Sequence, residues 1–181
     1  MRNILKLSAS LLIIAAISGT ILGIIYTVTK EPIAKRVKLE EEKALKAIFP
    51  KATSFNLTTG KDNYAYYEVY TKNKLIGYVI DASGEGFGGT IKIKVGMNLN
   101  KTIKAIRITS QNETPGLGTR VEGTKFTDQF MNKTLKQVLL KKDFSKGTID
   151  ALTGATISSR TVSEAVQKSM VEFLKIERKQ K

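Results

Sequence analysis

The stretch TIKIKVGMNLNKTIKAIRIT, residues 90–109, decides the fold class of this chain. It acts together with a second stretch of similar composition, YAYYEVYTKNKLIGYVIDA, at residues 64–82. Both are rich in β-branched and aromatic residues, a composition typical of strands. The pattern predicts strands over residues 64–70, 75–82, 90–95 and 102–109. A turn around Asn73 joins the first two strands, and residues 96–100 form a turn between the last two. Because short links join sequential strands, we expect an antiparallel sheet.

Helical spacing follows the predicted strands. Between about residues 158 and 177, apolar side chains recur on one helical face. These side chains are Val162, Val166, Met170, Phe173 and Leu174. A helix with such a face packs on a sheet, so the sequence predicts an α+β domain with helices flanking an antiparallel sheet. Residues 125–131 and 134–140 are shorter helical candidates.

The stretch at residues 7–28, LSASLLIIAAISGTILGIIYTV, is almost wholly apolar. It predicts a single N-terminal transmembrane helix, because about 20 apolar residues cross a bilayer as a helix. A cleaved signal peptide is the alternative, but the run is long and no clear A-x-A site follows it. We therefore expect an anchor (1–30), a juxtamembrane helix (31–50) with Pro32 in its first turn, and a globular domain (51–181).

The charge of the chain restricts its partners. The net charge is +14, from 30 Lys and Arg against 16 Asp and Glu. This balance suits anionic membrane lipid or acidic protein neighbours. The basic residues form short clusters and no stripe with interleaved aromatics, so we expect no nucleic-acid binding. Basic residues flank the apolar stretch on both sides, and a simple count of them would place the large domain in the cytoplasm.

The chain contains no cysteine and no histidine. This composition excludes structural zinc sites, iron–sulfur clusters and the usual haem ligands. It also excludes catalysis by Cys–His or Ser–His–Asp groups. Any redox chemistry must therefore be carried by an organic cofactor.

The segment DALTGATISS, residues 150–159, immediately precedes the predicted final helix. Thr156, Ser158 or Ser159 could each cap that helix. The N-terminus of a helix also attracts phosphate, because its first N–H groups are free and its dipole end is positive. A phosphate esterified to Thr156 would lie where those donors point, and the small Gly154 and Ala155 leave room for it.

Two other loops contain closely spaced glycines. Residues 84–89, GEGFGG, precede a predicted strand, which excludes a dinucleotide-binding loop because that loop must open a helix. They form either a flexible hairpin loop or a place where backbone approaches a ligand closely. Residues 113–118, ETPGLG, place Pro115 and Gly116 at the centre of a type II turn. This segment is either an ordinary loop or a second ligand loop.

Together, these three segments resemble the FMN-binding domain of the Rnf complex G subunit and of the C subunit of the sodium-pumping NADH:quinone oxidoreductase. Asp150 and residues 153–156 match the flavinylation motif D-x-x-S/T-G-A-T. In that family the last threonine receives FMN through a phosphoester, transferred from FAD by a dedicated flavin transferase. Residues 113–120 and 84–96 are similar to the family's E-T-P-G-L-G and G-x-G-F/Y-G-G-x-I segments. The short length favours the Rnf G subunit.

The resemblance implies a function and a site. It implies an electron-carrier subunit of an ion-translocating ferredoxin:NAD⁺ oxidoreductase, with other membrane subunits as partners and its domain outside the cytoplasm. Thr156 would carry FMN, and Asp150 would be recognised by the transferase. The expected cofactor-binding residues are Leu152, Thr153, Gly154, Ala155, Ser159, Glu113, Thr114, Pro115, Gly116, Leu117, Gly118, Phe87 and Gly88.

Thr156 is expected to accept the modification and not to catalyse it. Nothing near it in the sequence resembles a general base that could activate its hydroxyl, so attachment requires an external enzyme. Two alternatives remain. One is a membrane-anchored binding module without a redox cofactor, in which TGAT only begins a helix. The other is an extracytoplasmic flavoprotein reductase that serves a different acceptor.

Overall fold

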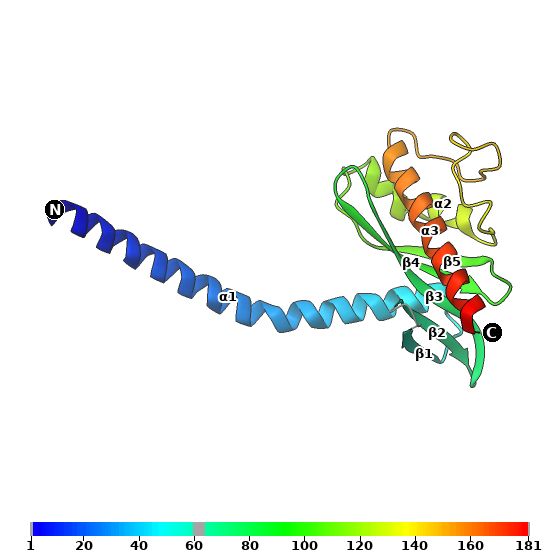
Figure 1. Cartoon of the computed structure of the whole chain (residues 1–181), viewed down its shortest axis with the longest axis horizontal. Coiled ribbons are helices and arrows are strands. Elements are labelled where there is room, and N and C mark those ends of the chain that lie inside the picture. The colour runs from blue at the N-terminus through cyan, green and yellow to red at the C-terminus, as the bar shows by residue number, and fades with distance from the viewer. Residues whose placement is uncertain (1, 60–63, 181) are drawn as a thin grey trace. The chain divides into compact units, whose positions relative to one another are not determined.

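The computed structural model describes residues 2–59 and 64–180, and its strands form one antiparallel sheet (Figure 1). The strands follow one another across the sheet in the order β1-β2-β3-β4-β5. The elements are α1 (Arg2–Ile48), β1 (Ser54–Thr59), β2 (Ala65–Thr71), β3 (Lys74–Glu85), β4 (Thr90–Asn98), β5 (Ile103–Ser110), η1 (Gly118–Glu122), α2 (Thr124–Thr127), η2 (Asp128–Phe130) and α3 (Thr156–Gln180). The predicted antiparallel sheet is confirmed.

The links between strands explain this order. Lys72 and Asn73 have φ of 49° and 61°, so both adopt the left-handed conformation that a two-residue hairpin turn requires. The predicted turn around Asn73 is therefore confirmed. The next predicted turn is displaced, because β4 continues to Asn98. Met97 is fully buried, which keeps that end of the strand paired, and the turn lies around Lys101 with φ of 67°.

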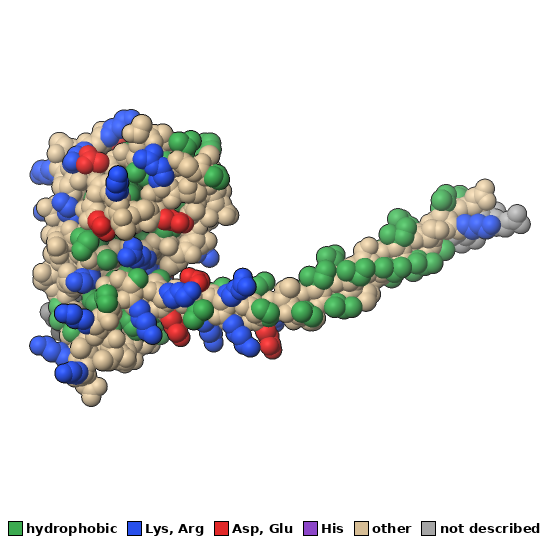
Figure 2. Space-filling model, turned by 180° about the vertical axis from the view of Figure 1, so that it is seen from behind, with side chains coloured by type: hydrophobic (Ala, Val, Ile, Leu, Met, Phe, Trp, Pro, Cys, Tyr) green, Lys and Arg blue, Asp and Glu red, His purple; other side chains and the backbone are tan. Residues whose placement is uncertain are grey.

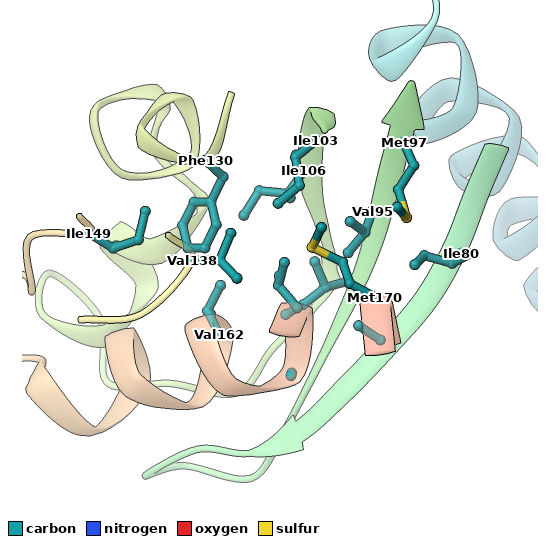
Figure 3. Close-up of a cluster of buried hydrophobic side chains, with 14 of the residues drawn as sticks. Ile80, Val95, Met97, Ile103, Ile106, Phe130, Val138, Ile149, Val162 and Met170 are labelled. Carbon is teal, nitrogen blue, oxygen red and sulfur yellow. The ribbon is translucent and has the colours of Figure 1, made fainter. Parts of the chain in front are cut away.

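Helix α3 covers one face of the sheet, and the main core lies between them. Its buried residues Val162 and Met170 project into this core (Figure 3), and the buried Val166 belongs to the same cluster. Ile80, Val95 and Ile106 project from the facing strands. The apolar face predicted for the final helix is thus confirmed, although the helix begins two residues earlier than expected and Leu174 is only partly buried.

The last turns of α1 cover the other face of the sheet. Leu45, Ile48 and Phe49 form a second cluster with Val69 and Val79. Gly96 of β4 makes this packing possible, since a Cβ atom there would collide with the Ile48 side chain. Helices therefore flank the sheet on both faces, as the α+β prediction required.

The chain divides into two compact units, residues 1–41 and 42–181, and α1 begins in the first. The helix is long and apolar enough to cross a membrane. Figure 2 shows apolar side chains covering its N-terminal part, with charged side chains farther along. The prediction of a separate helix starting at Pro32 is wrong, because Pro32 lies inside α1. Good helix formers follow it, and α1 continues although an interior proline removes one backbone donor and its ring crowds the carbonyl four residues earlier.

Three local predictions differ from the structure. Strand β1 was not predicted, because SFNLTT is a mostly exposed edge strand with little apolar patterning. Residues 125–131 form two short pieces, α2 and η2. Residues 134–140 are not helical. Leu140 instead forms a parallel bridge with Ile149, and the N–H of Ile149 donates to the carbonyl of Leu139.

Candidate functional site

The segment at residues 150–156 enters α3 through a tight turn. The N–H of Ala155 donates to the carbonyl of Leu152 over 3.0 Å. Gly154 stands at the third position of this turn with φ of 80°, the left-handed value of a type II turn. The glycine of the TGAT motif is therefore required by backbone conformation, and the turn delivers Thr156 as the first residue of the helix.

Thr156 is half-buried. The hydroxyls of Ser158 and Ser159, which were expected as possible helix caps, make other hydrogen bonds. The Ser159 hydroxyl donates to the carbonyl of Ala155 and accepts from the N–H of Leu152, at 2.8 and 3.0 Å. The Ser158 hydroxyl points to a carboxylate of another loop. None of the three hydroxyls proposed as caps precedes the helix, so that prediction is wrong. The first N–H groups of α3 have no intrahelical acceptor and offer a site for an anion.

Glu113 joins all three motif segments in one place. Its Oε2 accepts a hydrogen bond from Ser158 Oγ at 2.5 Å, and its Oε1 accepts one from the N–H of Gly88 at 3.0 Å. The residue is only 4% exposed. Gly118 allows this arrangement, because a Cβ atom there would lie 2.7 Å from Glu113 Cβ and 2.9 Å from Ser158 Oγ. The buried carboxylate thus connects the Gly-rich loop, the ETPGLG loop and α3.

A pocket of about 420 Å³ opens at this junction. It is lined by Phe87, Glu113, Thr114, Leu117, Gly118, Gly154, Ala155, Thr156, Ile157 and Ser158. The first eight were expected at the site, while Ile157 was missed and Ser158 was considered only as a cap. Their closeness to Thr156 in the sequence was the available signal. Phe87, Leu117 and Ile157 are 70%, 46% and 50% exposed, so the pocket has an apolar rim.

Six expected cofactor-binding residues lie outside the pocket lining. Pro115 and Gly116 form the predicted turn, in which the N–H of Leu117 donates to the carbonyl of Thr114 and Gly116 has φ of 76°. Leu152 packs on the main core, and Ser159 is buried below the turn. Thr153 is exposed. Gly88, also outside the lining, supports the pocket through its bond to Glu113.

Asp150 lies at the start of the attachment segment with its side chain in solvent. Its Oδ2 is 2.7 Å from Lys141 Nζ, an ion pair in which both side chains are more than half exposed. Nearby, Arg160 of α3 makes a bidentate pair with Asp143, at 2.7 and 2.9 Å. The hydrogen bonds and charge of the Arg160 guanidinium lower the pKa of Asp143. The Asp143–Arg160 pair thus links the loop at residues 141–150 to α3.

Glu113 is the one titratable side chain among the residues that line the pocket. In the described part of the chain, no cluster of three His, Cys, Asp or Glu side chains could hold a metal ion. The expectation of no general base near Thr156 needs correction, since Glu113 lines the same pocket. Both oxygens of that carboxylate are, however, bonded to Ser158 and Gly88.

Known proteins are similar to this chain in sequence and in fold. The family model described as the FMN-binding domain matches residues 86–171. The chain is 33% identical to the G subunit of the proton-translocating ferredoxin:NAD(+) oxidoreductase complex of Clostridium ljungdahlii, over 93% of this chain and 90% of that protein. It is 29% identical to the G subunit of the ion-translocating oxidoreductase complex of Methanosarcina acetivorans, over 96% and 95%. The crystal structure of the C subunit of the Na(+)-translocating NADH-quinone reductase from Parabacteroides distasonis has a similar fold, with a TM-score of 0.55, 22% identity and 62% of each chain covered.

Proposed function

This chain belongs to the family of ion-translocating oxidoreductase complex G subunits, and from that premise we propose that it carries FMN as a phosphoester on Thr156. The observation that carries the proposal is the position of Thr156. It is the first residue of a 25-residue helix and also lines the pocket built from the three motif segments. A phosphate on its hydroxyl would meet the free N–H groups and the positive end of that helix.

The residues around Thr156 fit such a group. Gly154 has no side chain to block the approach to the hydroxyl, and a Cβ atom there would lie 3.2 Å from Leu117 Cδ2. The apolar rim of Phe87, Leu117 and Ile157 suits a flat aromatic ring, while the pocket volume falls within the range of ligand sites, roughly 300–1,000 Å³. The backbone at the helix start would hold the phosphate, and the rim would hold the ring.

Attachment would need a second enzyme. Thr156 Oγ1 would form the bond to phosphorus while the pyrophosphate bond of FAD breaks and AMP leaves. The hydroxyl must lose its proton, and the carboxylate of Glu113 is already bonded to Ser158 and Gly88. A flavin transferase would therefore supply the base, and Asp150 would form part of the surface that it recognises.

FMN, when bound, supplies a carrier that accepts and passes on electrons singly or in pairs. The chain itself would position that carrier among other membrane subunits of an ion-translocating ferredoxin:NAD⁺ oxidoreductase. The apolar part of α1 would anchor it, and the +14 charge would favour contact with anionic lipid. A covalent tether keeps the cofactor at the site even where no free flavin is available.

The test is to co-express the full chain with a flavin transferase and to look for flavin fluorescence in the denatured band on a gel. We expect a fluorescent wild-type band, loss of fluorescence in Thr156→Ala, and retention in Thr156→Ser. Thr124→Ala is the matched control and should stay fluorescent, because Thr124 is an exposed threonine that also begins a helix but is not among the pocket-lining residues. A dark wild-type band with an active transferase would favour the binding module without a cofactor.

A further inference from the structure

A side chain from a different segment holds the main chain of Asp150. The N–H of Asp150 donates to Gln129 Oε1 at 2.7 Å, and Gln129 Nε2 donates to the carbonyl of Asp150 at 3.3 Å. The same amide nitrogen donates to the carbonyl of Lys125 at 3.4 Å, which fixes its orientation. The Gln129 amide therefore takes the place that a neighbouring strand would occupy beside Asp150.

The residues on both sides of Asp150 in the sequence are held by other contacts. Ile149 is fully buried, and its carbonyl accepts from the N–H of Lys141. Three residues further on, the carbonyl of Thr153 accepts from Arg120 Nη1 at 3.4 Å. Among the described residues, Gln129 is the only hydrogen-bonding partner of the Asp150 main chain. The position of the Asp150 main chain thus depends on Gln129, while the exposed Asp150 carboxylate also pairs with Lys141.

We propose that Gln129 is a positioning residue for flavin transfer, because it presents Asp150 and the following TGAT residues to the transferase in one conformation. The inference rests on the proposed function, since it concerns the enzyme that modifies Thr156. A loop held in its bound conformation before an encounter loses less conformational freedom on docking. The Lys141 ion pair is a weaker constraint, because both of its side chains are largely exposed.

The test compares the full-length wild-type protein with Gln129→Leu in detergent micelles, using FAD and a purified flavin transferase. The initial rate of in-gel flavin fluorescence gives kcat/KM, which we expect to fall about tenfold, the change expected for losing one or two neutral hydrogen bonds. Hydrogen exchange supplies a readout independent of the transferase. Exchange at the Asp150 amide should accelerate, while the Leu152 amide, bonded to Ser159 Oγ, should keep its rate.

Two further variants separate positioning from general stability. Gln137 also closes a loop, because its Oε1 accepts hydrogen bonds from the N–H and the hydroxyl of Thr134 at 3.0 Å each. Gln137→Leu removes these bonds, and this variant should be modified at the wild-type rate. Gln129→Glu keeps an acceptor for the Asp150 N–H and should give an intermediate rate.

The inference is overturned if Gln129→Leu is modified within twofold of wild type although its Asp150 amide exchanges faster. It is also overturned if Gln129→Leu and Gln137→Leu slow modification equally. A wild-type protein that is not modified at all contradicts the proposed function, a result that is distinguishable because it appears before any Gln129 variant is compared.

Discussion

Glu113 and Ser158 are separated by 45 positions in the sequence, yet Ser158 Oγ donates to Glu113 Oε2 at 2.5 Å in a buried contact. This hydrogen bond connects the ETPGLG loop to the first turn of α3, next to Thr156. Glu113 also receives the N–H of Gly88, so one carboxylate holds three separate segments around the pocket. Several properties of the protein should therefore depend on this contact.

Replacing Glu113 by Ala should lower the free energy of unfolding by roughly 3 kcal/mol, because it leaves the buried Ser158 hydroxyl and the part-buried N–H of Gly88 without their acceptor. Glu113→Gln should cost less, about 1 kcal/mol, since its amide oxygen can still accept one hydrogen bond. Urea unfolding of the full chain in detergent would measure both. Glu122→Gln is the control, because it makes the same change at an exposed carboxylate. If Glu122→Gln lowered the free energy of unfolding as much as Glu113→Ala, the buried hydrogen bonds of Glu113 would not explain the effect.

Two glycines of the ETPGLG loop should respond to alanine for different reasons. Gly118→Ala should destabilise by roughly 1–3 kcal/mol, because the new Cβ meets Glu113 and Ser158 in a packed site. Gly116→Ala meets no atom within 4 Å, but its φ of 76° should cost about 1–2 kcal/mol. Only Gly118→Ala should also slow flavin attachment at Thr156. Equal attachment rates in the two variants would show that the Glu113–Ser158 contact does not shape the pocket.

The Asp143–Arg160 pair predicts a pH-dependent stability difference between wild type and Asp143→Asn. The hydrogen bonds from Arg160 lower the folded-state pKa of Asp143 below its ordinary 3.8. Its contribution is therefore present above that ordinary value and is lost as the pH falls through the folded-state pKa. We expect wild type to be more stable at pH 7, with the difference shrinking below about pH 4. A difference that stays constant down to pH 2 would exclude this pair as its source.

The parts of the fold that could be predicted are those specified by local pattern. The strands of the meander and α3 carry their core residues at periods of two and 3.6, and the Asn73 turn needs only two adjacent left-handed residues. Family membership followed from short motifs and is confirmed by the relatives. Strand β1 could not be predicted in this way, because an exposed edge strand such as SFNLTT lacks a buried face.

The internal structure of the site depended on contacts between distant segments. The sequence indicated which loops would gather, but not that Glu113 would bond to Ser158 or that Gln129 would hold Asp150. Both contacts join residues more than twenty positions apart, and no periodicity signals them. The prediction of a helix at residues 134–140 is wrong because Leu140 at its end forms a parallel bridge with Ile149, a contact that helical spacing does not signal.

The side of the membrane that holds the domain can be tested because the chain has no native cysteine. Basic residues flank the apolar part of α1 on both sides. Because long domains cross a membrane largely independently of such charges, this charge distribution is compatible with an extracytoplasmic domain. We expect Ser110→Cys, at the exposed end of β5, to react with a membrane-impermeant maleimide in intact spheroplasts. Asn3→Cys should react only after lysis. The reverse pattern would place the domain in the cytoplasm, where a transferase and free flavin would have to meet it.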